Sequence, residues 1–262
     1  MRTLKSSTFK PSPDRHGREV VANKILLSLP RKQRQEAFSR VEFVELPVRT
    51  VLHEGAQPIH FGYFINSGLA SVLSVMKDGK SLEVGLAGSE GFVGLPLVVG
   101  LKTAPTRVIM QVAGSAFRIS AKNLNSALKG CNQLQKELLQ YTQEMTMQAT
   151  QVAACNRAHG VNQRLARWLL MSQDRLGGDL VPLTQDFLAH MLGTRRASVT
   201  VAAGILQKAG LITYSRGAIK IPSRRNLENA ACECYAALIQ QTRLWHKESK
   251  RFLSRREETL AA

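Results

Sequence analysis

The hydrophobic pattern of the chain changes its period near Ser120, and this change limits the fold more than any other feature. Over residues 41–118, short runs of Val, Ile, Leu and Phe alternate with glycine-containing turns, which is typical of β-strands. After Ser120, apolar residues recur every three or four positions, which is typical of amphipathic helices. Strands followed by helices predict an α+β chain built from two units.

The first unit is predicted to be an antiparallel β-roll of the double-stranded β-helix or jelly-roll kind. Short strands are expected in segments such as TVLHEG, FGYFINSG and RVIMQVAGSAFRI. Asp78 and Gly79 are expected to close a hairpin, because this pair readily adopts the positive φ values of tight turns. Many short strands separated by turns favour a sandwich, a barrel or a roll.

A long helix is predicted over residues 132–156, after a short one that Ser120 can cap and Gly130 can end. Its apolar residues follow heptad-like steps: Leu134, Leu138, Tyr141, Met145 and Val152. Such a stripe packs either against its own domain or against the same helix of a second copy. We expect the second arrangement, a dimerisation helix. A further helix is expected to end at Gly177-Gly178.

Residues 183–209, LTQDFLAHMLGTRRASVTVAAGILQKA, predict a helix-turn-helix. Thr184 is the expected N-cap of the first helix, and Gly193 is expected to supply the positive φ of the turn. The second helix is expected to begin near Thr194 or Arg195. Its core side is predicted to hold Val199, Ala202, Ala203, Leu206 and Ala209.

The start of this second helix carries side chains that can read DNA. In a helix-turn-helix it is this part that enters the major groove, where arginine pairs with guanine and hydroxyls bind bases or phosphates. The predicted base-reading residues are Arg195, Arg196 and Ser198. The following segment LITYSRGAIKIP predicts a β-hairpin wing. The predicted phosphate contacts are Thr184, Thr194, Thr200, Arg216 at the wing tip, and Lys220.

The distribution of charge supports a polyanion partner. The 262 residues carry a net charge of +17, of which residues 1–34 contribute +7, residues 35–130 only +2, and residues 184–225 +6. A near-neutral block between two basic ones favours a middle domain with another task and a C-terminal domain that faces phosphates. Double-stranded DNA is therefore the expected partner.

Other classes of protein lack support in the sequence. The longest apolar run, residues 92–101, is about half the length of a membrane-spanning helix, and the first residues include no apolar signal segment. Four cysteines in a chain of this length favour a reducing compartment, so we expect a cytoplasmic protein without a membrane partner. The motifs of nucleophile elbows, phosphate-binding loops and zinc proteases do not occur. We expect no enzyme, no catalytic residue and no cofactor.

The order of a near-neutral roll, a long helix and a winged helix-turn-helix resembles the Crp/Fnr family of bacterial transcription regulators. The resemblance covers roughly residues 35–225. It is carried by LTQDFLAHMLGTRRASVTVAAGILQKAGLI and by HEG (53–55), INSG (65–68), DGK (78–80) and GSEGFVG (88–94). It implies a homodimer whose rolls sense a signal and whose subunits each read half of a palindromic operator, with RNA polymerase and a small-molecule effector as further partners.

The resemblance also implies residue roles, and the sequence departs from some of them. Arg196 matches the family's guanine-reading arginine and Ser198 a phosphate-contacting hydroxyl, but Ala197 and Val201 stand where many members carry Glu and Arg. Cyclic-nucleotide binders need a Glu for the ribose and an Arg-Ser pair for the phosphate. The candidate effector-pocket positions here are Leu95, Thr106 and Arg107. A buried phosphate needs compensating charge, so we expect no tight binding of cyclic AMP.

Metal sites are also not expected from the sequence. The family's iron–sulfur branch uses cysteines near the N-terminus, whereas the first cysteine here is Cys131. His53 and His60 lie in the roll without a pattern that marks a haem ligand. Cys155 and His159 are four apart on a predicted helix, and Cys232-Glu233-Cys234 forms a C-x-C, but each pair lacks the second pair that a zinc site requires. We predict no metal and keep a redox role for Cys232 and Cys234 as a hypothesis.

The predicted organisation has five segments. They are a basic disordered arm (1–20), the roll (21–130), the dimerisation helix (131–156), the winged helix-turn-helix (157–225) and a C-terminal helical extension (226–262). The predicted function is sequence-specific regulation of transcription through a signal other than cyclic AMP. The alternative is a constitutive or architectural DNA-binding protein with a vestigial sensor domain.

Overall fold

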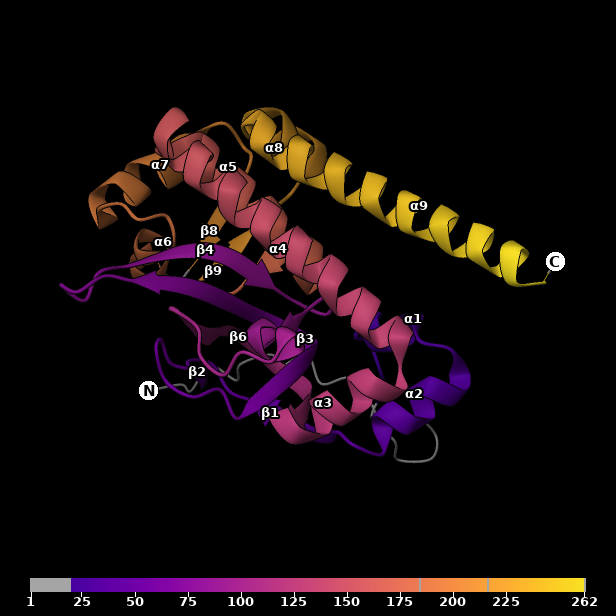
Figure 1. The fold of residues 1–262 in the computed structure, drawn as a ribbon. Helices are drawn as coiled ribbons and strands as arrows, with labels where there is room; N and C mark the ends of the chain where they lie inside the picture. Colours follow the sequence, from indigo (N-terminus) through magenta and orange to yellow (C-terminus); the bar gives the residue numbers. More distant parts are fainter. Residues whose placement is uncertain (1–19, 184, 216, 262) are drawn as a thin grey trace.

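The structure is a computed structural model that describes residues 20–183, 185–215 and 217–261, with the side chains of 185–186 and 250–261 left out. The predicted disordered arm therefore lies outside the described residues, apart from Val20. The described chain is α+β, as the change of period predicts, with the strands of a roll followed by helices (Figure 1).

The roll is one antiparallel sheet with the strand order β1-β6-β3-β4. Its strands are β1 (Glu42–Leu46), β2 (Val51–His53), β3 (Phe61–Val75), β4 (Ser81–Ala87), β5 (Phe92–Val93) and β6 (Thr106–Ser120), and a 3-10 helix η1 covers Leu95–Val99. β2 adds to β6, and β5 adds to β3. The hairpin between β3 and β4 closes as predicted, with Gly79 at a φ of +82°.

Four helices border the roll: α1 (Lys24–Ser28), α2 (Arg31–Phe38), α3 (Ala121–Gly130) and α4 (Asn132–Ala158). Ser120 caps α3 as predicted, because its hydroxyl accepts a hydrogen bond from the Asn123 amide. The cluster that joins these helices to the sheet includes Leu26, Phe64, Phe117 and Leu124. The same cluster includes Leu134, Leu138 and Tyr141 of α4, and burial of these side chains holds α4 against the roll.

The heptad residues of α4 lie differently from the expected dimer seam. Leu134, Leu138, Tyr141 and Val152 are buried within their own chain, and Met145 packs at the edge of the roll cluster. The stripe that resembles a coiled-coil seam therefore covers the chain's own sheet. The physical reason is that an apolar stripe at this spacing buries equally well against any apolar face, and the roll supplies the nearest one.

The second unit contains α5 (Val161–Leu176), β7 (Leu180–Val181), α6 (Gln185–Met191), α7 (Arg196–Lys208), β8 (Thr213–Ser215) and β9 (Ala218–Lys220). β7, β9 and β8 form a small antiparallel sheet, so the wing forms as predicted and gains a third strand. Trp168, Leu188 and Leu206 lie in one core that also includes Leu69 and Leu86 of the roll. The two units therefore share a hydrophobic contact.

The C-terminal extension is helical, as expected, and forms α8 (Arg224–Ala230) and α9 (Glu233–Ala261). Figure 1 shows α9 running alongside α4. The two helices are antiparallel, because Gln151 contacts Cys234 near the start of α9 while Glu144 contacts His246 further along it. Among the described residues, no helix is both long and apolar enough to cross a membrane.

Candidate nucleic-acid interface

The turn between α6 and α7 has the backbone that the sequence predicts. Gly193 has a φ of +56°, a backbone conformation that is unfavourable for residues with a Cβ atom. The amide of Thr194 donates to the carbonyl of Ala189 at 3.0 Å, which closes the end of α6. Arg195 then takes an extended conformation as the N-cap of α7. The turn therefore changes the direction of the chain between α6 and α7 and places Arg195 and Arg196 at the start of α7.

The predicted base-reading residues lie together on this helix start. Arg195 and Arg196 are exposed, and Ser198 is partly exposed. Val199, Ala202, Ala203 and Leu206 are buried as predicted, which holds the opposite face of α7 in the core. Ala209 is not part of that face: it is the exposed C-cap residue, because the helix ends one residue earlier, at Lys208.

The outer face of α7 also contains two apolar residues that are absent from the predicted interface. Val201 is 64% exposed and Ile205 is 50% exposed, and the two lie one helical turn apart on the exposed face of α7. Apolar groups in a major groove can contact the methyl group of thymine. The signal that could have revealed them is their spacing, because they fall between the buried positions of α7.

Three of the five predicted phosphate-contacting residues lie among the described residues. Thr194 is half-buried in the turn, Thr200 is exposed and donates its hydroxyl to the Arg196 carbonyl at 3.1 Å, and Lys220 is exposed on the wing, 3.6 Å from Asp179. Thr184 and Arg216 lie outside the described residues. Thr194 and Thr200 lie near the start of α7, whereas Lys220 pairs in the wing with Thr213, which follows the end of α7.

The hairpin between β3 and β4 reaches from the roll to the turn of the helix-turn-helix. A Cβ on Gly193 would overlap Leu82 Cδ1, so the glycine permits close contact with β4. Between hairpin and helix lies a groove of about 1180 Å³, lined by Asp78 and Lys80 on one side and by Arg195 and Arg196 on the other. The roll therefore touches the element that would contact DNA.

A buried carboxylate forms a second connection between the units. Glu83 of β4 accepts hydrogen bonds from Trp168 Nε1 of α5 at 2.6 Å, from Ser71 Oγ at 2.5 Å and from Gln111 Nε2 at 2.9 Å. Burial raises the pKa of Glu83 to about 7, although these hydrogen bonds favour the charged form. The carboxyl group therefore changes charge near neutral pH at the contact between the roll and α5.

The three residues predicted for an effector pocket lie in two different environments. Arg107 of β6 forms an ion pair with Glu54 at 3.3 Å, and Thr106 precedes it at the start of the strand. Leu95 begins η1 and packs against the cluster around α3. None of the three lines the groove beside α7 or the cavity between α4 and α9.

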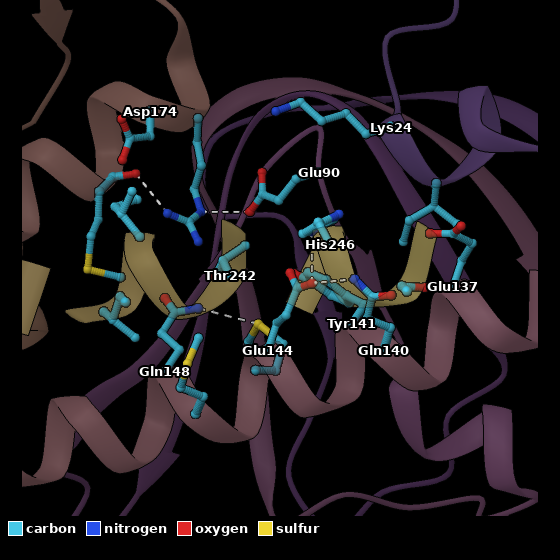
Figure 2. Close-up of a pocket in the computed structure, with 18 of the residues that line it drawn as sticks. Lys24, Glu90, Glu137, Gln140, Tyr141, Glu144, Gln148, Asp174, Thr242 and His246 are labelled. Carbon is cyan, nitrogen blue, oxygen red and sulfur yellow. Dashed lines mark hydrogen bonds and ion pairs between the residues drawn. The ribbon is translucent and has the colours of Figure 1, made fainter. Parts of the chain in front are cut away.

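This second cavity, of about 470 Å³, lies between α4, α9 and the loop that contains Glu90. In Figure 2 a dashed line joins the labelled residues Glu144 and His246. Glu144 Oε1 lies 3.0 Å from His246 Nε2, and Glu90 Oε1 lies 2.8 Å from Arg175 Nε. The charged lining has two cations against four carboxylates: Lys24 and Arg175, and Glu90, Glu137, Glu144 and Asp174. This balance does not suit a phosphate anion.

The two cysteine-containing pairs that the sequence shows separately come together in the structure. The ligand atoms of Cys155, His159, Cys232 and Cys234 all lie within 4.8 Å of one another. The expectation that each pair lacks a second pair is therefore wrong, because α9 packs on α4. The pKa of Cys155 is lowered to about 5, first by its hydrogen bond with Cys232 and also by the charge of Arg167.

Comparison with known proteins agrees with this geometry. Residues 46–131 match the family model of the cyclic nucleotide-binding domain, and residues 163–230 match that of the Crp-like helix-turn-helix domain. Together these segments span more than half of the chain. The comparison with curated proteins found no match.

Solved structures show the same fold at low identity. FixK2 from Bradyrhizobium japonicum is 16% identical, with a TM-score of 0.64 over 73% of this chain and 98% of that chain. The c-di-GMP responsive global regulator CLP from Xanthomonas campestris is 19% identical, with a TM-score of 0.59 over 72% and 98%. A CRP/FNR family transcriptional regulator from Thermus thermophilus is 22% identical, also with a TM-score of 0.59 over 72% and 98%. With both of its domains matched in this order, the chain belongs to the Crp/Fnr family of DNA-binding transcription regulators.

Proposed function

We propose that the protein is a homodimeric regulator that reads a palindromic operator with the start of α7 and responds through its roll to a signal other than cyclic AMP. The observation that carries this proposal is the exposed Arg195-Arg196 pair at a helix start, with Ser198 in the same turn. The guanidinium fork of arginine matches guanine O6 and N7 in the major groove. Lys220 on the wing adds a phosphate contact that positions the helix.

The dimer seam is assigned to the outer face of α4, because the heptad residues are buried in their own chain. This face presents Leu139, Thr146, Thr150 and Ala153 at steps of three, four and seven residues. The hydroxyls of Thr146 and Thr150 donate to carbonyls one turn earlier at 2.9 Å, so a partner helix can cover them without leaving unpaired donors. A two-fold seam on α4 would present two α7 helices to half-sites about 34–36 Å apart.

Sedimentation of the full chain tests this seam. Leu139→Asp is expected to convert a dimer to a monomer and to weaken operator binding, because a charge would face the same helix of the partner. The matched control is Leu244→Asp on α9, where the leucine is also exposed but lies on another helix. Dimers of the Leu139→Asp variant would contradict the seam.

Control through the roll is supported by two direct contacts. Leu82 lies against Gly193 of the turn, and Glu83 binds Trp168 of α5. A shift of β4 on ligand binding would therefore move the helix-turn-helix without an intermediate element. A signal other than cyclic AMP is supported by the Arg107–Glu54 ion pair, which already engages the cation that a cyclic phosphate would need.

The competing function is that of a constitutive or architectural DNA-binding protein with a vestigial sensor domain. Genome-wide mapping of binding sites followed by competition binding separates the two. A specific operator is expected to be bound about 10³- to 10⁷-fold more tightly than random DNA. Equal affinity for all sequences would support the architectural function. RNA polymerase and a small-molecule effector stay predicted partners.

A further inference from the structure

The end of α4 and the start of α9 bring together a set of ligands typical of a structural metal ion. We propose that Cys155, His159, Cys232 and Cys234 bind one Zn²⁺ ion that joins α9 to the connection between α4 and α5. Cys155 and His159 are one helical turn apart and lie on the same side of α4. Cys232 and Cys234 flank the first residue of α9. All three cysteines are buried and free of disulfides.

The distances fit a single tetrahedral ion. Cys155 Sγ lies 3.4 Å from Cys232 Sγ, and Cys234 Sγ lies 3.6 Å from His159 Nδ1. Zinc binds sulfur at about 2.3 Å and imidazole nitrogen at about 2.0–2.1 Å, so its tetrahedral ligands are about 3.5–3.8 Å apart. Three thiolates and one imidazole form a soft donor set that favours zinc and completes its coordination without water. The site is therefore of the structural and not the catalytic kind.

Neighbouring side chains form hydrogen bonds to the proposed ligands and thereby fix their orientation. His159 directs Nδ1 toward Cys234, and its other ring nitrogen, Nε2, lies 3.1 Å from Glu233 Oε1. A carboxylate at this nitrogen holds the tautomer in which the first nitrogen can bind a metal. Gln151 Nε2 donates to Cys234 Sγ at 3.1 Å, as an amide donates to a metal-bound thiolate. Buried thiols that serve only as small apolar groups do not require these partners.

Buried positive charge lies next to the cluster. Arg167 is only 2% exposed, and its one hydrogen bond among the described residues goes to Met171 Sδ at 3.1 Å. Its Nε is buried without a hydrogen-bond partner in the same set, and its charge acts on Cys155. A buried guanidinium needs a nearby negative charge. Zinc with three thiolates and a neutral imidazole carries one net negative charge, and binding releases the thiol protons to solvent.

The position of the site gives it a consequence for the fold. His159 is the C-cap of α4, and the next residue, Gly160, is the N-cap of α5. An ion bound there would hold the direction in which the DNA-binding unit leaves α4. It would also anchor the start of α9, which packs on α4 and α5 and borders the 470 Å³ cavity.

Metal analysis of the full-length protein tests the proposal. Purified protein is expected to contain about one zinc per chain, and apo-protein loaded with Co²⁺ alone is expected to show thiolate charge-transfer and tetrahedral absorption bands. Cys234→Ser and His159→Ala are expected to lose the zinc. Cys131→Ser is the matched control, because this cysteine is also buried but contacts Gln33 far from the cluster. It is expected to retain the zinc and the cobalt bands.

Two further measurements keep the test independent of misfolding. Glu233→Gln alters only the exposed partner of His159 and is expected to weaken zinc binding about 10- to 100-fold. A chelator is expected to lower the Tm of the wild type and of Cys131→Ser, but not that of Cys234→Ser. Zinc content equal in wild type and Cys234→Ser, an iron–sulfur chromophore, or a Cys155–Cys232 disulfide in the native protein would each overturn the proposal.

Discussion

Trp168 Nε1 of α5 donates a hydrogen bond to Glu83 Oε1 of the roll at 2.6 Å. Both side chains are buried, so the bond joins the sheet of the roll to the DNA-binding unit in an interior that solvent does not screen. A carboxylate in such a place costs free energy unless it is fully hydrogen-bonded or protonated. This residue pair therefore makes the contact between the two units sensitive to pH.

Glu83→Gln is expected to flatten the dependence of stability on pH. The pKa of Glu83 is raised from 4.5 to about 7 in the folded chain, mainly by burial. Its contribution to stability is therefore complete below pH 4.5 and is lost as pH rises through 7, on the order of 3 kcal/mol. Denaturant unfolding between pH 5 and 8 measures this. Glu45→Gln on the exposed side of β1 is the control, and an equal pH dependence in wild type and Glu83→Gln would refute the prediction.

Arg196→Ala is expected to weaken operator binding by about 1–3 kcal/mol and to relax specificity at one base position. The reason is the loss of a bidentate contact with guanine. Arg196→Lys is the informative control, because it keeps the charge and removes the fork. Fluorescence anisotropy with the operator and its single-base variants makes the comparison. An equal loss on every sequence would show that Arg196 contacts phosphate instead.

Lys220→Ala is expected to weaken binding to all sequences by a similar factor. Lys220 is exposed on the wing, where its charge would neutralise one phosphate. The slope of log affinity against log salt is expected to fall by about one. Arg216→Ala at the wing tip carries the same expectation from the sequence. A change of base preference in either variant would argue against a phosphate contact.

Gly193→Ala is expected to destabilise the chain by about 1–2 kcal/mol through its positive φ alone, with a further loss from overlap with Leu82. Leu82→Ala in the same chain is expected to relieve only the overlap. Gly204→Ala inside α7 is the control, because a Cβ there meets nothing and alanine favours helix. Unfolding free energies of the wild type and these three variants form the test, and full rescue by Leu82→Ala would show that φ strain contributes nothing.

Isothermal titration with cyclic AMP is expected to show no binding in the micromolar range. Arg107 is engaged by Glu54, and Leu95 offers no carboxylate to a ribose. Glu54→Gln would release Arg107 from its ion pair, so the affinity of this variant for cyclic AMP is the comparison for the wild type. Micromolar or tighter affinity in the wild type would mean that the roll binds the nucleotide in another way.

Local signals in the sequence were sufficient for much of the fold. The change of period near Ser120, the Asp78-Gly79 turn and the positive φ at Gly193 each depend on residues close in the chain, so pattern and backbone preference determine them. The spacing also predicts the buried side of α7, except at Ala209, which is exposed because it lies beyond the end of the helix. The sequence motifs were also sufficient to indicate the Crp/Fnr family, which the two family models support.

Contacts between distant segments were decided by the tertiary structure. The stripe on α4 predicted a partner helix, but the roll covers it, because periodicity shows that a face is apolar and not what buries it. Cys155 and Cys232 are 77 residues apart, and only the antiparallel packing of α9 on α4 brings their sulfurs within 3.4 Å. The sequence by itself determined the two units and the helix-turn-helix. The tertiary structure decided how the units touch and where Cys155, His159, Cys232 and Cys234 meet, since both depend on packing over long chain separations.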